Sequence, residues 1–180
     1  MSGVSKKTRL LVISALLTAV AAALSVVDSM IPVQAVVPLP GLKLGLANIV
    51  TIFAIFFLGY KYMFAIVTAR CLLGAVFGGG PVSLVFSLSG ALAAAAVMLL
   101  MKKGYGRLFS FYGISLAGSA AFNIMQVIAA AVILQNTAIF TYLPILMIGG
   151  VATGILTATI FGVFFNKIEK SGIVKRYLSR

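Results

Sequence analysis

Six long apolar runs, separated by short segments that carry most of the charge, constrain this chain more than any other feature. The runs cover residues 10–27, 44–58, 62–77, 82–101, 108–134 and 143–165, of which the second and third are short. A helix needs about 20 apolar residues to cross the hydrocarbon core of a bilayer. Helices are favoured because hydrocarbon offers backbone groups no other partner, and the alternating pattern of a membrane barrel does not occur. The sequence therefore predicts an all-α membrane protein, a six-transmembrane-helix bundle that forms one domain over residues 1–180.

The composition excludes several classes of protein. Hydrophobic residues make up 62% of the chain and charged residues 9%, which is too little charge for the surface of a soluble domain. Cys71 is the single cysteine and there is no histidine, so an internal disulfide, a cysteine-rich metal site and a His-dependent nucleophile are excluded. The two acids, Asp28 and Glu169, cannot form the carboxylate cluster of a two-metal site, and no phosphate-binding loop occurs. We expect no catalytic residue, metal or cofactor, and no enzyme activity.

The positions of the basic residues predict how the chain lies in the membrane. If the N-terminus is inside, twelve of the fourteen basic residues fall on inner segments, Lys43 falls on an outer one, and Arg70 lies within a span. This asymmetry follows the positive-inside rule and indicates an even number of spans, because both tails are basic. We expect a multi-pass membrane protein with cytoplasmic N- and C-termini. Positive charges beside lipid headgroups also argue against a nucleic-acid partner.

Arg70 is the most informative polar residue, because it lies in the middle of the third run. A guanidinium at that depth is costly and needs a partner, water or a ligand. Its geometry suits a carboxylate or a phosphate. The alternatives are an ion pair with Asp28 and a side chain that reaches the membrane surface, and the sequence leaves all three open.

Amide side chains form a second group of predicted substrate-binding residues. Asn123 and Gln126 are three residues apart and share one face of the fifth run, and Asn48 lies near the outer end of the second. Hydrogen bonds between helices are the alternative role for such residues. Asp28 and Lys43 flank a Pro-rich outer segment, which we expect to lie at the membrane surface or to cover a pocket open to the outside. For either of these two residues taken alone, a solvated side chain is the favoured alternative.

Small residues repeat along the first run. Ala15, Ala19 and Ala23 are spaced four residues apart, which gives a flat helix face that another helix can approach closely. The sequence does not distinguish packing within the bundle from docking to another subunit.

Three segments resemble a bacterial membrane family known as the Gx transporter or heptaprenyl diphosphate synthase component I family. They are PGLKLGLANIVTIFAIFFLGYKY (40–62), TARCLLGAVFGGG (68–80) and AAFNIMQ (120–126), and the resemblance extends over about residues 10–170. Many members are expected to have a histidine before the asparagine of the third segment, where this chain has Phe122.

The family is similar in architecture to the S components of energy-coupling factor transporters. This resemblance implies six helices, an outward-facing pocket, a lid after the first helix, and docking to a coupling subunit and ATPases through Ala15, Ala19 and Ala23. It implies that Asn48, Arg70, Asn123 and Gln126 line the pocket. We expect a substrate-binding subunit for a small anionic or amphiphilic vitamin, or for an isoprenoid or quinone precursor. The alternative is a non-catalytic membrane component of prenyl diphosphate or menaquinone synthesis, or of a membrane redox complex. Prenyl transfer usually needs aspartate-rich motifs, and this chain has one aspartate.

Overall fold

The computed structural model describes residues 6–31 and 42–170, and within these ranges the chain is helical with no β-strand. The helices are α1 (Lys6–Met30), α2 (Asn48–Phe57), α3 (Tyr60–Gly74), α4 (Gly80–Lys102), α5 (Phe111–Leu134) and α6 (Leu143–Lys170). A π-helical turn (Ala75–Gly79) joins α3 to α4, and a 3-10 helix (Thr137–Tyr142) precedes α6. The six-helix bundle expected from the sequence is therefore confirmed.

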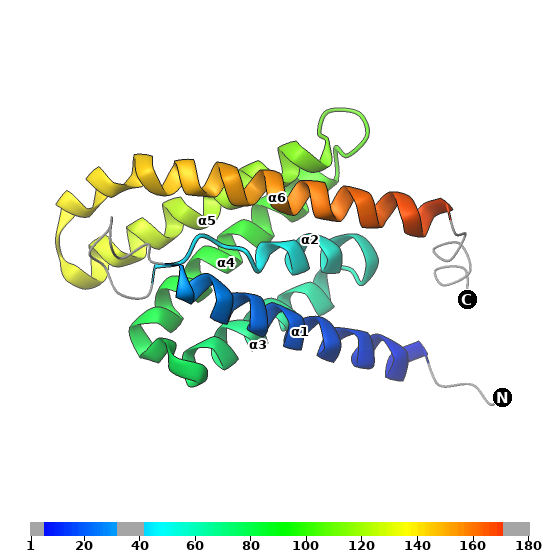
Figure 1. The fold of residues 1–180 in the computed structure, drawn as a ribbon, viewed down its shortest axis with the longest axis horizontal. Coiled ribbons are helices and arrows are strands. Elements are labelled where there is room, and N and C mark those ends of the chain that lie inside the picture. Colours follow the sequence, from blue (N-terminus) through cyan, green and yellow to red (C-terminus); the bar gives the residue numbers. More distant parts are fainter. Residues whose placement is uncertain (1–5, 32–41, 171–180) are drawn as a thin grey trace.

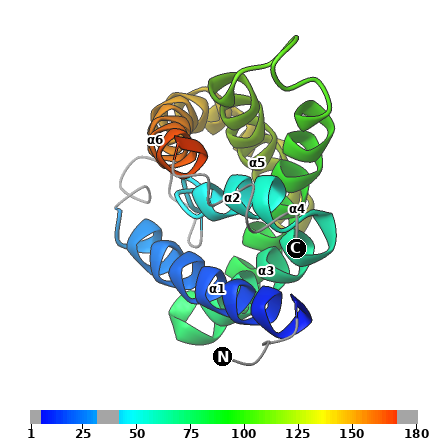
Figure 2. The ribbon, with the colours of Figure 1, turned by 90° about the vertical axis from the view of Figure 1, so that its right-hand side faces the viewer.

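The short helix α2 lies in the middle of the bundle. Figure 2, which views the bundle from one end, shows the five long helices arranged around it. Helix α2 contacts all five, whereas α1 packs mainly against α3 and α2. The N-terminal end of α2 is buried, so neighbouring elements must satisfy its backbone groups. At its C-terminal end, the Nζ of Lys102 donates a hydrogen bond to the carbonyl of Ile55 and lies 5.1 Å from the centre of the Phe56 ring.

Local sequence signals explain where the helices begin and end. The hydroxyl of Ser110 caps α5 by accepting a hydrogen bond from the backbone N–H of Gly113 at 3.2 Å. Gly59 separates α2 from α3 with a φ of 86°, a conformation that side chains with a Cβ rarely adopt. Between α3 and α4 the chain passes through the π-helical turn, and Gly80 changes its direction with a φ of 68°.

Five helices among the described residues are long and apolar enough to cross a membrane. They are contained in α1, α3 with its π-helical turn, α4, α5, and α6 with the preceding 3-10 helix. Large apolar side chains are exposed on their outward faces, including Leu16 (63%), Val132 (70%) and Ile148 (71%). Surfaces of this kind are stable in lipid rather than in water. The chain is a multi-pass membrane protein.

The second apolar run differs from the other five. Of predicted residues 44–58, only Asn48–Phe57 is α-helical, and these 10 residues extend about 15 Å, half of the hydrocarbon thickness. Residues 42–47, which precede α2, are not helical. Gly45 among them has a φ of 90°, so an α-helix cannot continue through this position. This non-helical backbone is acceptable at depth because protein surrounds it.

The beginning of α1, the end of α6 and the α4–α5 connection lie at the same end of the bundle (Figure 1). This end carries exposed basic side chains, among them Lys7, Lys103, Arg107 and Lys167. We call it the basic end. The α3–α4 and α5–α6 connections lie at the opposite end (Figure 1).

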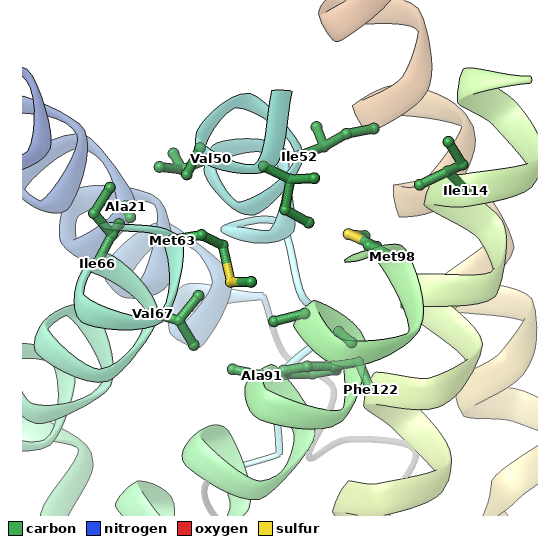
Figure 3. Packing of buried hydrophobic residues seen from close by; sticks show 14 of the residues in the cluster. Ala21, Val50, Ile52, Met63, Ile66, Val67, Ala91, Met98, Ile114 and Phe122 are labelled. Carbon is green, nitrogen blue, oxygen red and sulfur yellow. The ribbon is translucent and has the colours of Figure 1, made fainter. Parts of the chain in front are cut away.

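Two clusters of buried apolar side chains hold the bundle together. The large apolar cluster gathers residues of all six helices, and Figure 3 shows Ile52 of α2, Met63 and Val67 of α3, and Met98 of α4 among them. The small apolar cluster consists of Leu42, Phe86, Val127, Ala130, Ile139 and Leu146. Between them lie the buried polar side chains described next.

Candidate functional site

The carboxylate of Asp28 fixes the segment that leads into α2. Asp28 lies in the last turn of α1 and is 2% exposed. Its Oδ1 accepts the N–H of Leu44 at 3.0 Å, and its Oδ2 accepts the N–H groups of Gly45 and Leu46 at 2.8 and 3.1 Å. Such bonds to a charged acceptor are stronger than neutral ones. Asp28 therefore joins α1 to residues 44–46 and holds the backbone in the shape that α2 needs.

Lys43 connects this segment to two other helices. Its backbone N–H donates to Oε1 of Gln126 on α5 at 3.3 Å. Its Nζ lies against α3, where a Cβ added to Gly74 would be 3.6 Å away. The side chain is 6% exposed. Burial lowers the pKa of the Lys43 amine from its ordinary value, and the charge of Arg70 also lowers it, whereas Asp28 raises it.

Arg70 and Asn48 form a buried pair between α3 and α2. Nη2 of Arg70 donates to Oδ1 of Asn48 at 3.2 Å, and the two residues are 4% and 0% exposed. Burial of the guanidinium contradicts a side chain that extends to the membrane surface. Asp28 directs its carboxylate to backbone N–H groups, and Arg70 contacts Asn48, so the structure does not show the alternative of an Asp28–Arg70 hydrogen-bonded pair among the described residues.

Asn123 and Gln126 both point into the bundle from α5, but toward different neighbours. Nδ2 of Asn123 donates to the carbonyl of Leu146 on α6 at 2.8 Å, whereas Gln126 contacts Lys43. Both are 0% exposed. The two side chains share one face of α5, as predicted. Asn123 links α5 to α6 and Gln126 links α5 to the segment before α2, which agrees with the alternative role of hydrogen bonding within the bundle.

Phe122 lies beside the asparagines in a space that two glycines provide. A Cβ added to Gly45 would lie 3.2 Å from the Phe122 ring and 2.9 Å from Nδ2 of Asn48. A Cβ added to Gly90 on α4 would lie 3.0 Å from the same ring. The ring therefore fills the position between α4 and residue 45, next to Asn48, where many relatives are expected to have histidine.

Several polar atoms in this region have no hydrogen-bond partner among the residues that the structure describes. They are Nδ2 of Asn48, Oγ1 of Thr51, Nε of Arg70, Oγ of Ser87, Oδ1 of Asn123 and Nε2 of Gln126. An unsatisfied buried polar atom costs about 1–3 kcal/mol, so such a concentration needs a reason. Each atom retains an unused capacity for one hydrogen bond.

These side chains form one layer across the bundle. We define the polar layer as Lys43, Asn48, Thr51, Arg70, Ser87, Asn123 and Gln126. On α4, Ser87 lies between Phe86 of the small apolar cluster and Ala91 of the large one. Helix α5 runs in the opposite direction, and its Asn123 and Gln126 lie between Phe122 of the large cluster and Val127 of the small one. On α4 and α5 the polar side chains therefore lie between the two apolar clusters, whereas Arg70 on α3 has Val67 and Cys71 of the large cluster on either side. Apolar surroundings of this kind strengthen electrostatic interactions.

Three predicted docking residues lie apart from the polar layer. Ala15, Ala19 and Ala23 are exposed on the outward face of α1, whereas Ala21 and Ala22 are buried toward α3 and α2. The alternative in which this stripe packs within the bundle is contradicted by its exposure.

Sequence reasoning missed three contributors to the site. Thr51 and Thr153 looked like ordinary residues of apolar helices, yet Thr51 is unpartnered and Thr153 donates to the carbonyl of Leu44 at 3.2 Å. Ser87 lies in the fourth apolar run, and a serine in such a run is a weak signal because it commonly bonds its own helix. The signal that could have identified them is a hydroxyl side chain on the helix face that is buried. The predicted lid lies mainly in residues 32–41, outside the described part of the chain.

Comparison with known proteins gives one match. The model of a family described as heptaprenyl diphosphate synthase component I matches residues 17–164, which include every side chain of the polar layer. No curated protein and no solved structure matches the chain.

Proposed function

The chain belongs to the heptaprenyl diphosphate synthase component I family, and from this premise we propose that it is the substrate-binding membrane subunit of an energy-coupling factor type transporter. Its substrate is a small anionic or amphiphilic compound, either a vitamin or an isoprenoid or quinone precursor. The protein itself carries out no chemistry on the substrate. It works in a bacterial cell membrane with both termini in the cytoplasm.

The observation that carries this proposal is the polar layer inside a lipid-exposed bundle. Arg70, Asn48 and Gln126 are each at most 4% exposed, and each has an unpartnered N–H donor. Polar groups at membrane depth are expensive, and a bound polar substrate compensates for them. Asp28 and Lys43 complete the site by fixing its backbone and adding positive charge.

The location of the layer supports uptake from outside. Helix α2 begins at Asn48, and this beginning points away from the basic end (Figure 1), toward the side that the positive-inside rule assigns to the exterior. On α4 and α5 the small apolar cluster lies on that side of the layer, so a substrate that enters between these helices requires the cluster to open. Energy for release comes from partner ATPases, docked on Ala15, Ala19 and Ala23 through a coupling subunit.

Co-purification and uptake test this function together. A tagged protein isolated in mild detergent should retain a transmembrane coupling subunit and ATPases. Cells that express all components should accumulate the substrate that mass spectrometry identifies in the isolated protein, and should lose this uptake when the ATPases are inactive. Isolation without these partners, together with ATPase-independent accumulation, would reject the transporter assignment.

A second function is favoured by the family description, which refers to one component of a synthase. In this case the chain is a non-catalytic membrane component of prenyl diphosphate or menaquinone synthesis, or of a membrane redox complex. The same isolation separates the two functions, because a prenyl-transferring or redox subunit would then accompany the chain in place of ATPases.

A further inference from the structure

The charges buried among the described residues do not balance. Asp28, Lys43 and Arg70 are the charged residues that are at most 6% exposed. Arg70 and Gly74 lie one turn apart on α3, and Nζ of Lys43 is near the Cβ position of Gly74. An ammonium and a guanidinium therefore share one face of α3. Counting Asp28 as one negative charge leaves this group with a net charge of +1.

The rest of the chain cannot supply the missing negative charge. The only other acid in the sequence is Glu169, in the last turn of α6 at the basic end. Residues 29–42 contain no charged side chain. Cys71 is a free thiol next to Arg70, and a thiol with an ordinary pKa of about 8.5 is mostly neutral at pH 7. A buried charge without a counter-charge is strongly unfavourable, so the anion must come from a bound molecule.

We propose that the polar layer binds a monoanion whose head group is a single carboxylate, and that it discriminates against phosphate monoesters and diphosphates. This inference rests on the proposed binding function and specifies its substrate class. One negative charge neutralises the group, whereas a dianion or trianion would leave an unpaired negative charge among buried side chains. The unpartnered donors are Nε of Arg70, Nδ2 of Asn48 and Nε2 of Gln126, and a carboxylate has about four lone pairs to receive them.

A diphosphate would need further cations that this site does not offer. Diphosphates are usually bound through several basic residues or through magnesium held by carboxylates. Within residues 6–31 and 42–170, no group of three or more His, Cys, Asp or Glu side chains could hold a metal ion. The carboxylate of Asp28, turned to backbone N–H groups, would instead repel the added negative charge.

Substitution of Asn48 tests the charge deficit without knowledge of the ligand. Oδ1 of Asn48 already accepts a hydrogen bond from Arg70, so Asn48→Asp adds one negative charge at nearly constant shape. If the group lacks one negative charge, the ligand-free Asn48→Asp protein in detergent should melt at least about 3 °C above the wild type. In the control Asn123→Asp, the added carboxylate faces the carbonyl of Leu146, so the Tm should fall. A decrease in both variants would overturn the proposal.

Mass spectrometry of released compounds provides the second measurement. A compound with one carboxyl group should be released from the wild type and recovered at least about 10-fold less from Asn48→Asp, because the new carboxylate occupies its place. Its mass distinguishes a fatty acid of the membrane from a water-soluble acid. The proposal would be overturned if the compound released from the wild type and depleted in Asn48→Asp were a diphosphate or a neutral molecule. Equal recovery from the two proteins would also overturn it. If Asn48→Asp is stabilised but no ATPase-driven uptake exists, the transport function fails and the charge assignment stands.

Discussion

Arg70 of α3 and Asn48 of α2 are 22 residues apart in the sequence and are joined by a buried hydrogen bond of 3.2 Å between Nη2 and Oδ1. The bond uses one edge of the guanidinium, and neither Nε of Arg70 nor Nδ2 of Asn48 has a hydrogen-bond partner within residues 6–31 and 42–170. A pair that was purely structural would be expected to satisfy these groups. The predictions below depend on this difference between holding a helix in place and binding a molecule.

Arg70→Gln should release the bound compound and leave the ligand-free protein at least as stable as the wild type. Loss of a charge-assisted hydrogen bond costs about 1.5–3 kcal/mol, which corresponds to a roughly 10–100-fold weaker Kd. Removing the guanidinium also removes the buried excess of positive charge. The measurements are mass spectrometry of retained compounds and thermal unfolding in detergent. Arg107→Gln, which removes an exposed charge at the basic end, should retain the compound. Full retention by Arg70→Gln would exclude Arg70 from the site.

Asp28→Ala should lower the thermal stability strongly, because three backbone N–H groups lose a charged acceptor. We expect a loss of about 3 kcal/mol or more, or a decrease in Tm of roughly 6–12 °C for a chain of this length. Asp28→Asn keeps one acceptor oxygen and should lie between the wild type and Asp28→Ala. Ser29→Ala removes an exposed hydroxyl of the same turn and serves as the control. Equal Tm values for Asp28→Ala and Ser29→Ala would disprove the role of Asp28.

Lys43→Met should raise the stability of the ligand-free protein at neutral pH, and the gain should disappear as the pH rises to about 10.5. Burial lowers the pKa of Lys43 in the folded protein, so the unfolded chain binds more protons between this lowered pKa and the ordinary value of 10.5. Wild-type stability therefore increases with pH across this window relative to Lys43→Met. The measurement is Tm as a function of pH for both proteins. Lys61→Met, at an exposed position, controls for the loss of one positive charge. A constant difference between wild type and Lys43→Met would contradict this prediction.

Ala19→Trp should abolish uptake that depends on partner ATPases and leave the fold and the bound compound unchanged. Ala19 is exposed, so the bundle tolerates the larger side chain, but a helix can no longer approach closely. Co-purification of the coupling subunit and transport assays in whole cells would measure the effect. The matched control is Ile148→Trp, which changes an equally lipid-exposed position on α6. Normal uptake by Ala19→Trp would remove this face of α1 from the docking surface.

Gly45→Ala and Gly59→Ala form a matched pair that separates backbone strain from disturbance of the site. Both glycines have a positive φ, of 90° and 86°, so each alanine should lower stability by about 1–3 kcal/mol. The Cβ at residue 45 also meets Nδ2 of Asn48 and the Phe122 ring, whereas residue 59 has nothing within 4 Å. Gly45→Ala should therefore lose the bound compound and Gly59→Ala should keep it, as measured by mass spectrometry. Retention in both would place the site away from residue 45.

The sequence by itself determined the membrane-embedded helical bundle, because apolar runs of spanning length have one stable solution in hydrocarbon. It also indicated Arg70, Asn48, Asn123 and Gln126, since polar groups inside apolar runs are costly wherever they point. The resemblance carried by residues 40–62 identified the family, which the match over residues 17–164 confirms.

Tertiary structure alone decided which groups meet. Asp28 was the candidate ion-pair partner of Arg70, but its carboxylate accepts hydrogen bonds from three backbone N–H groups. These N–H groups precede α2 in the middle of the bundle, where no water can satisfy them. The second apolar run became a 10-residue helix for the same reason: Gly45 and Asp28 stabilise a non-helical entry that protein surrounds. Periodicity within one run reports which face is apolar, but the partner of a polar atom depends on residues tens of positions away, and only packing brings them together.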